Sequence, residues 1–205
     1  MTADPSQDGE DAAWVTIETP FAAGELRSFL DDVERLYRIN SLLVFEDWHQ
    51  TDETRYRLRA ENLSNGRLLD TELGVDATED GIAVRYSDGL KTATRFRVEP
   101  RTDGPAKLIV TDDYSGTSPD ERAARIDEVD KSLVEWGRNL HRYLHQWKKW
   151  SWLPGWKFYM RRVWQPMKPM ARRICFILIV VTAAEFALFL FVFAIFWLEL
   201  DQYLE

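Results

Sequence analysis

The chain has 205 residues, with 34 acidic and 26 basic side chains and a formal net charge of −8. This length accommodates one ordinary domain with a core, plus an appendage. Residues 151–205 hold six Lys and Arg and four Asp and Glu, which leaves 20 basic and 30 acidic residues upstream. The acidic upstream part excludes nucleic acid as the main partner, because phosphate binding depends on clustered Lys and Arg. A single cysteine, Cys175, excludes an internal disulfide.

The N-terminal stretch is predicted to be a disordered lead. Residues 1–13 are polar, acidic and rich in Asp, Ser and Gly. Apolar and polar residues then alternate over 14–18, which predicts a strand that Pro20 ends. Over 21–40, apolar residues recur at helical spacing and predict one or two helices.

Six short apolar-polar runs follow and predict an antiparallel meander. Turns such as Ser64-Asn65-Gly66 and Ser87-Asp88-Gly89 separate them, and each supplies a residue that tolerates positive φ. The predicted strands are 41–50, 54–62, 68–78, 81–87, 92–99 and 107–114.

The pattern then changes to a long helix over 120–150, for which Ser118-Pro119 offers a start. Its apolar positions step by threes and fours: Ile126, Val129, Leu133, Trp136, Leu140, Tyr143, Trp147 and Trp150. We expect this helix to cover the sheet. The spacing is also close to a heptad, so a coiled-coil dimer is the alternative.

A basic and aromatic segment, 151–173, is predicted to lie at a membrane interface. Prolines cut it into short pieces, and aromatic side chains mixed with Lys and Arg favour the lipid headgroup layer. RNA binding is the other use of such a mixture, but a membrane span beside it favours lipid. The predicted interface residues are Trp150, Trp152, Trp156, Arg161, Arg162, Trp164, Arg172 and Arg173.

One transmembrane helix is predicted over 174–200. From Ile174 to Leu198 the chain is apolar for 25 residues except at Thr182 and Glu185, a length of about 37 Å. Basic residues precede the span and acidic residues follow it, so the positive-inside rule predicts a cytosolic domain, which in a bacterium would be at the inner (plasma) membrane. With a short tail over 201–205 and no signal peptide at the start, the arrangement is typical of a tail anchor.

Glu185 lies near the middle of this span. An ionised carboxylate there costs roughly 2.5 kcal/mol or more. It therefore needs a hydrogen bond to a neighbouring helix or to Thr182, and a proton or ligand path is the alternative. Ala183 and Ala187 share the opposite face and allow the close approach of a transmembrane partner protein, although lipid-facing alanines give the same pattern.

The order of strand, helical pair, six strands and long helix resembles the START-like superfamily. This superfamily is also called Bet v 1-like, SRPBCC, or polyketide cyclase/dehydrase and lipid transport. The resemblance covers 14–150, and its local carrier is WVTIETPFAAGELRSFLDDVERLYRINSLLVFEDW at 14–48. It implies an α+β helix-grip fold, in which a curved antiparallel sheet of about seven strands wraps around the long helix.

The resemblance also implies a cavity for a lipid, sterol, quinone or polyketide-like molecule. By position, Leu133, Trp136 and Leu140 would line this cavity, and four further residues would gate its entrance. The alternative is that these large side chains fill the core. The predicted gate residues are Leu36, Tyr37, Ile39 and Leu42.

The sequence offers few groups for chemistry, so we predict no catalytic residue, no cofactor and no metal. His141 and His145 stand one helical turn apart, but no third ligand is evident. His49, in a strand, is either a general base or a structural histidine. The acidic pairs at 31–32 and 112–113 occur at element ends, where solvated carboxylates are common.

Three functions remain open at this stage. The first is a membrane-anchored module that binds or transfers a hydrophobic small molecule and contacts membrane lipids. The second is an accessory subunit docked on a larger membrane complex through its transmembrane helix. The third is a cyclase or dehydratase acting on a membrane-soluble substrate.

Overall fold

The computed structural model describes residues 11–125, 129 and 131–201. The chain divides into two compact units, with the boundary between Pro166 and Met167. The first unit holds the sheet and the shorter helices, and the second holds the apolar helix. Each is described by itself below.

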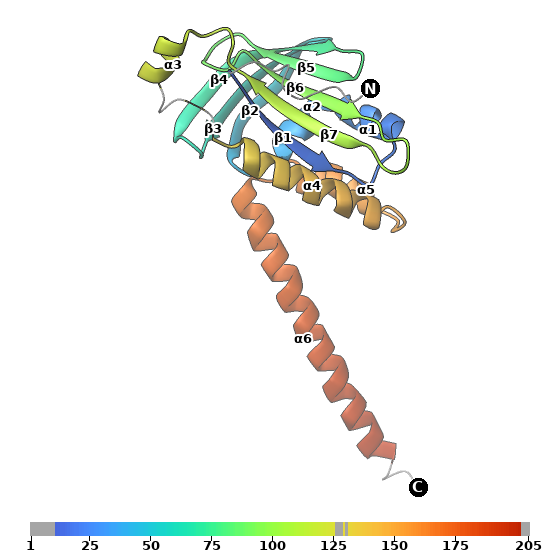
Figure 1. Ribbon diagram of the computed structural model, residues 1–205. Coiled ribbons are helices and arrows are strands. Elements are labelled where there is room, and N and C mark those ends of the chain that lie inside the picture. Colours follow the sequence, from blue (N-terminus) through green and yellow to red (C-terminus); the bar gives the residue numbers. More distant parts are fainter. Residues whose placement is uncertain (1–10, 126–128, 130, 202–205) are drawn as a thin grey trace. The chain divides into compact units, whose positions relative to one another are not determined.

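The first unit is built on one antiparallel sheet of seven strands (Figure 1). Strands β2 to β7 form the predicted meander, and the first strand pairs with the last, so that the spatial order is β1-β7-β6-β5-β4-β3-β2. The fold class predicted from the alternating runs is confirmed. The strands are β1 (Ala12–Glu18), β2 (Leu43–Asp52), β3 (Arg55–Asn62), β4 (Arg67–Ala77), β5 (Gly81–Tyr86), β6 (Ala93–Glu99) and β7 (Lys107–Asp113).

Strand β1 begins two residues earlier than the sequence predicts. Ala12 pairs with Asp113 and Ala13 with Asp112, so the pairing with β7 holds both alanines in the sheet. Asp11 of the predicted disordered lead lies in a turn before β1, and residues 1–10 lie outside the described residues.

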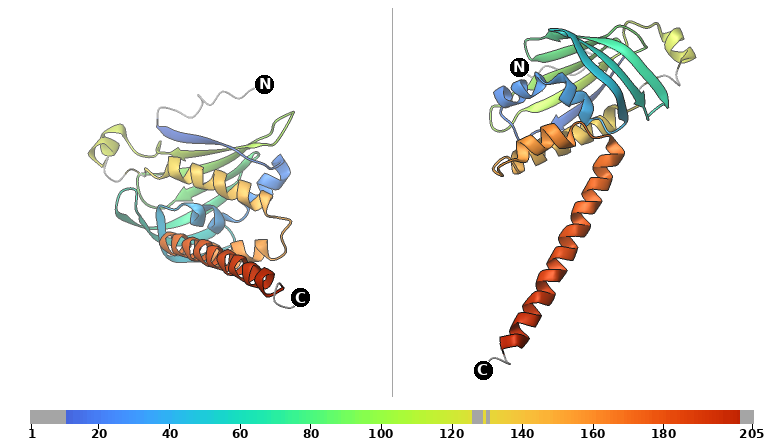
Figure 2. Two further views of the ribbon diagram at one scale, coloured as in Figure 1. Left: turned by 90° about the horizontal axis from the view of Figure 1, so that it is seen from below. Right: turned by 180° about the vertical axis from the view of Figure 1, so that it is seen from behind.

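Two short helices, α1 (Ala23–Leu30) and α2 (Val33–Ile39), fill the predicted helical stretch. Asp31 ends the first helix, and Asp32 caps the second, because the Asp32 carboxylate accepts a hydrogen bond from the Arg35 amide at 3.1 Å. Contacts run from α1 to β5 and β6, and from α2 to β2 and α4. Both helices therefore lie on the side of the sheet that faces α4, as Figure 2 shows from behind.

Helix α4 (Leu133–Lys149) covers the sheet and supplies the centre of the core. Trp136 is 1% exposed, and its indole N–H donates to the Leu36 carbonyl at 2.9 Å. Gly137 allows α4 to approach β1, because a Cβ at this position would lie 2.8 Å from a methyl group of Val15. The long helix packs on the sheet, as predicted.

The prediction of one long helix over 120–150 was wrong, because the helix that packs on the sheet is shorter. A separate helix, α3, occupies Pro119–Ala124, and α4 starts only at Leu133. Ser132 is buried, and its hydroxyl accepts a hydrogen bond from the Asn40 side chain at 3.0 Å, while the Lys131 amide donates to Ser64. These tertiary bonds fix the backbone before α4 and compete with helix formation there. Val129 lies in a bend, and Ile126 lies outside the described residues.

Beyond α4 the chain turns back onto the domain. Helix α5 (Trp156–Tyr159) and a π-helical turn, η3 (Met160–Trp164), bring Met160 to 1% exposure in the core. The Trp164 ring lies 5.4 Å from the Tyr143 ring of α4. Part of the predicted interface segment thus belongs to the packed first unit.

The second unit consists of the helix α6 (Pro169–Asp201). Its stretch Pro169–Leu198 is long and apolar enough to cross a membrane, and an 18-residue window within it has a mean hydropathy of 2.7. The helix starts at Pro169, five residues before the predicted span, and proline suits this first position because its missing N–H would have no helical partner there. Of the predicted tail 201–205, Asp201 ends α6 and residues 202–205 lie outside the described part.

Candidate functional site

Side chains occupy the space between the sheet and α4 where the resemblance implies a cavity. Of the seven predicted cavity residues, Leu42 is half-buried and the other six are buried: Leu36, Tyr37, Ile39, Leu133, Trp136 and Leu140. The Trp136 ring lies 5.1 Å from the Tyr37 ring and 5.4 Å from the Phe96 ring. These residues form a packed aromatic core in this structure.

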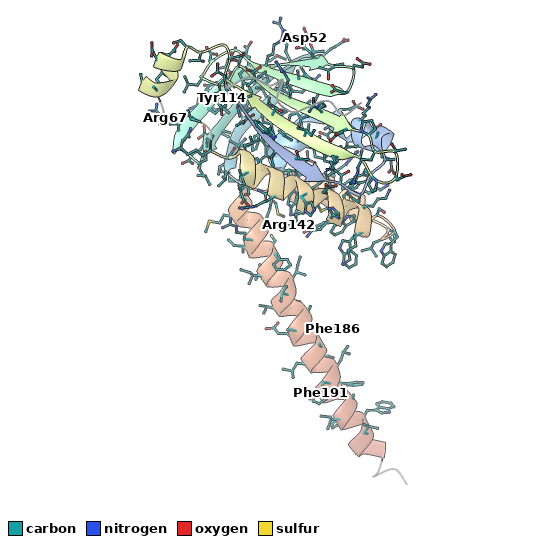
Figure 3. All side chains as sticks on the ribbon, in the orientation of Figure 1. Asp52, Arg67, Tyr114, Arg142, Phe186 and Phe191 are labelled. Atoms are coloured by element: carbon teal, nitrogen blue, oxygen red, sulfur yellow. The ribbon has the colours of Figure 1, made fainter. Side chains whose placement is uncertain are left out.

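A small pocket, of about 140 Å³, opens beside this core. The β3–β4 hairpin forms one wall and the loop after β5 forms the other. Arg67 and Tyr114, which both line it, are labelled in Figure 3. The lining residues are Asn62, Asn65, Arg67, Leu68, Leu69, Tyr86, Asp88, Gly89, Leu90, Lys91 and Tyr114.

Local hydrogen bonds fix the loop after β5. Gly89 has a φ of 110°, which an L side chain rarely adopts, so the turn at this point requires glycine. The Asp88 amide donates to the Thr71 hydroxyl at 3.3 Å, and the Thr117 hydroxyl donates to the Leu90 carbonyl at 3.0 Å. The loop therefore holds Leu90 and Lys91 at the pocket wall.

A chain of hydrogen bonds runs from the pocket into the core. The Tyr86 hydroxyl lies 2.6 Å from the Tyr37 hydroxyl and 3.0 Å from the Thr94 hydroxyl. Thr94 donates to Asp112 at 2.6 Å, and Lys91 donates to the other oxygen of the same carboxylate at 3.2 Å. Asp112 is 1% exposed and Thr94 is 0% exposed, so this network is buried except where Tyr86 and Lys91 reach the pocket.

The direction of these bonds follows from the carboxylate. The Thr94 hydroxyl has one hydrogen, and it donates that hydrogen to Asp112. Tyr86 must then donate to Thr94, and Tyr37 must donate to Tyr86. The network is thus polarised toward the Asp112–Lys91 pair.

Burial keeps both phenols protonated. Desolvation raises the pKa of Tyr37 well above its usual value, and the nearby Tyr86 hydroxyl raises it further. Desolvation also raises the pKa of Tyr86, although the Lys91 charge opposes this effect. The two tyrosines are therefore hydrogen-bonding groups rather than general bases. A polar atom that enters the pocket meets a neutral phenol and an ammonium group.

The sequence missed this site, and its prediction for Asp112 and Asp113 was wrong. Both carboxylates are buried rather than solvated, and Asp113 pairs with Arg95 at 2.8 Å. The signal was available in the strand alternation, since residues two apart lie on one face. Asp112 follows the buried Val110, and Tyr86 follows the buried Val84 on the same face.

The histidines lie outside the pocket. His49 is exposed on β2 and lies 2.8 Å from Asp47. His141 and His145 are exposed on α4, with their rings 4.3 Å apart. Within the described residues, no group of three or more His, Cys, Asp or Glu side chains is arranged to hold a metal ion.

The predicted interface residues occur in different surroundings. Trp152 is 72% exposed and Trp150 is 38% exposed, whereas Trp156 and Trp164 are half-buried against the core. The neighbouring Phe158 is 65% exposed. Arg161 and Arg162 are exposed on the first unit, while Arg172 and Arg173 belong to the first turns of α6.

The predicted contact residues of the span are Ala183, Glu185 and Ala187. All three are exposed on α6. Their role in contacting a partner remains a prediction.

Comparison with known proteins supports the fold. No protein-family model and no curated protein matches the sequence. Among solved structures, a START superfamily protein from Mycobacterium smegmatis is 17% identical with a TM-score of 0.50, and the match covers 66% of this chain and 98% of that chain. A protein from Thermus thermophilus is 15% identical with a TM-score of 0.47, over 66% of this chain and 97% of that chain. At such identities the likeness concerns the fold alone: this chain has a START-like, Bet v 1-like helix-grip fold followed by a long apolar helix.

Proposed function

We propose that this chain is a membrane-anchored, cytosol-facing module that binds a hydrophobic molecule through one polar group. The observation that carries the proposal is the pocket beside β5, in which three leucines lie next to the ends of a buried polar network. Leu68, Leu69 and Leu90 supply apolar surface, while Tyr86 and Lys91 connect the pocket to the network. A concave site that combines apolar surface with convergent polar groups is typical of a ligand site.

The size of the pocket limits what it holds. At about 140 Å³ it is smaller than the 300–1,000 Å³ that is typical of sites for drug-sized ligands. We infer that the pocket takes the polar end of a lipid, quinone or polyketide-like molecule. Deeper entry requires the aromatic core to open. In that step Tyr37, which bonds to Tyr86, moves first, and the residues predicted from the resemblance (Leu36, Ile39, Leu42, Leu133, Trp136 and Leu140) become the cavity wall.

A membrane anchor suits such a ligand. Moving an acyl or prenyl chain from a bilayer into water costs about 0.8 kcal/mol for each methylene group. In the proposed arrangement, α6 spans the membrane, the basic residues before it stay on the cytosolic side, and Trp150 and Trp152 contact lipid headgroups. The binding domain then stays at the surface that contains its ligand.

The test is to purify the full chain from membranes and to identify apolar molecules in its organic extract by mass spectrometry. A Leu69→Trp variant fills the pocket, and a Leu63→Trp variant places the same side chain at an exposed position that does not line it. We expect one apolar species at stoichiometric amount in the wild type and in Leu63→Trp, and its loss in Leu69→Trp. An equal amount in all three chains would show that bulk lipid, not the pocket, is its source.

Glu185 favours a second candidate function, an accessory subunit of a membrane complex. It is an exposed carboxylate on an apolar helix, and a carboxylate at this depth in a bilayer is stabilised by a partner. Ala183 and Ala187 offer the opposite face for close helix packing. Co-purification of membrane proteins with the wild type and with Glu185→Leu tests this function, with Phe186→Leu as the control. Equal recovery of partners from all three chains would exclude a role for Glu185.

A further inference from the structure

Charge is strongly segregated along this acidic chain. Between Glu135 and Glu185 there is no acidic residue, and the intervening 49 residues contain ten Lys and Arg. In the first unit these cations gather on α4 and the segment that follows it. The exposed side of α4 carries a set of residues that we name the basic face: Arg138, His141, Arg142, His145 and Lys149.

The described structure uses little of this positive charge internally. Arg138 lies 3.3 Å from Glu135, and Lys149 lies over the Trp150 ring at 5.4 Å. In the described part of the chain, Arg142 makes no ion pair or hydrogen bond. Figure 3 shows Arg142 on the side of α4 that faces away from the sheet. The basic face is therefore available to an external anion-bearing surface.

Apolar surface borders the cations on both sides. An open groove of about 730 Å³ runs between α4 and β1, with the half-buried Val15 and the exposed Val134 among its lining residues. At the C-terminal end of α4, the chain continues into Trp152, which is 72% exposed, and Phe158, which is 65% exposed. Cations next to exposed aromatic and aliphatic groups match the boundary between lipid headgroups and acyl chains.

The covalent structure keeps the last residue of the first unit near the start of α6. Only Met167 and Lys168 separate the last residue of the first unit from Pro169. Three residue steps span at most about 11 Å, whatever the arrangement of the two units. A membrane that α6 enters therefore lies within reach of the first unit.

We propose that the basic face of α4 docks the domain onto anionic phospholipid headgroups of the membrane that α6 enters. The proposal rests on the membrane anchor proposed above and names its lipid partner. Docking in this way holds α4 against the bilayer and fixes the orientation of the pocket relative to the lipid surface. It depends on surface charge, whereas insertion of α6 depends on apolar length.

The experiment uses the full chain in proteoliposomes, with Cys175→Ala as the background. A spin label at Gln146→Cys reports on the exposed side of α4, and a label at Glu53→Cys reports on the turn beside Asp52, which Figure 3 shows far from Arg142. Collision rates with a water-soluble and a lipid-soluble relaxation agent give the surroundings of each label. They are measured in phosphatidylcholine vesicles and in vesicles that contain about 30% phosphatidylglycerol.

Docking predicts that the Gln146→Cys label is shielded from water only in the anionic vesicles, while the Glu53→Cys label is water-exposed in both. Arg142→Gln together with Lys149→Gln lowers the docked-to-undocked ratio by about 25-fold, since each cation near an anionic surface contributes roughly fivefold. Arg27→Gln together with Arg55→Gln removes two exposed cations elsewhere and leaves the ratio unchanged.

Equal water exposure at Gln146→Cys in both vesicles would overturn the proposal. Equal shielding in both would also overturn it, because the contact would then be independent of lipid charge. An equal loss with Arg27→Gln and Arg55→Gln would reduce the effect to overall charge and reject a specific face. A recovered ligand without docking rejects only this inference, and docking without a ligand rejects only the proposed binding function.

Discussion

The polarity of the buried network gives a prediction that separates two nearly identical substitutions. If Tyr37 donates to Tyr86 and Tyr86 donates to Thr94, then Tyr86→Phe leaves the Tyr37 hydroxyl without an acceptor. Tyr37 is 1% exposed, so water does not replace the lost bond. An unsatisfied buried donor costs about 1–3 kcal/mol, and Thr94 loses its donor as well.

Substitution of the other tyrosine, Tyr37→Phe, should destabilise the protein less. Tyr37→Phe removes one hydrogen bond, but Tyr86 still donates to Thr94. The expected loss in the free energy of unfolding is about 0.5–1.5 kcal/mol. The double variant leaves no stranded phenol, so it costs less than the sum of the two single variants.

The measurement is urea unfolding of the full chain in detergent, with the near-ultraviolet circular dichroism signal of the domain as the readout. Tyr86→Phe should lower the free energy of unfolding by more than Tyr37→Phe does. If Tyr37→Phe were the more damaging variant, the hydrogen bonds would run in the opposite direction and the polarised network would be refuted.

Three further predictions concern packing and pH. Gly137→Ala should lower the free energy of unfolding by about 1–3 kcal/mol, because the new Cβ would lie 2.8 Å from the Val15 side chain of β1. In the control variant Gly24→Ala the new Cβ meets no atom within 4 Å, so this variant should not be destabilised. Equal melting temperatures of the two variants would contradict the close approach of α4 to β1. Trp164→Ala should lower the free energy of unfolding by about 2 kcal/mol and Trp152→Ala by less than about 0.5 kcal/mol, because of these two tryptophans only Trp164 packs on the core. Equal losses of stability in chemical denaturation would contradict the packing of the segment after α4 on the domain. Burial raises the pKa of Tyr143 to about 12, so the folded state keeps a proton that the unfolded chain releases above about pH 10. The free energy of unfolding should therefore fall by about 2 kcal/mol between pH 10 and 12 through this group, and that of Tyr143→Phe should fall less steeply over the same range. Identical pH profiles of the two proteins would contradict the raised pKa.

The sheet was predictable because most strands alternate apolar and polar residues, and most of the turns between them contain or adjoin a glycine. One face of such a strand must be buried, and the order of six short strands leaves a meander as the simplest pairing. The pairing of β1 with β7 was not predicted, because these strands are far apart in the sequence and local pattern does not show which strands pair.

The start of α4 was not predictable from periodicity. The apolar spacing continues upstream of Leu133, but Ser132 bonds to Asn40, a residue 92 positions earlier in the chain. A tertiary contact of this kind overrides the local helical pattern. The same limit applies to Trp156 and Trp164. The composition of their segment, 151–173, is typical of a lipid interface, although their rings pack on the core.

The polar network was missed for a different reason. Acidic residues at strand ends are usually solvated, and that general preference was applied to Asp112. Asp112 lies on the buried face of its strand. Its charge is compensated by Lys91, from the loop after β5, and by Thr94 of the neighbouring strand β6. Local charge counts do not identify such partners, whereas strand registers do.

The central claim is that a hydrophobic ligand binds by its polar end between the β3–β4 hairpin and the loop after β5. An experimental density map of the full chain, purified from membranes in lipid nanodiscs, tests it most directly. We expect elongated density in this pocket, ending within hydrogen-bonding distance of the Tyr86 hydroxyl or the Lys91 ammonium group. A pocket that holds only water in such a map, with the core closed around Trp136, would contradict it.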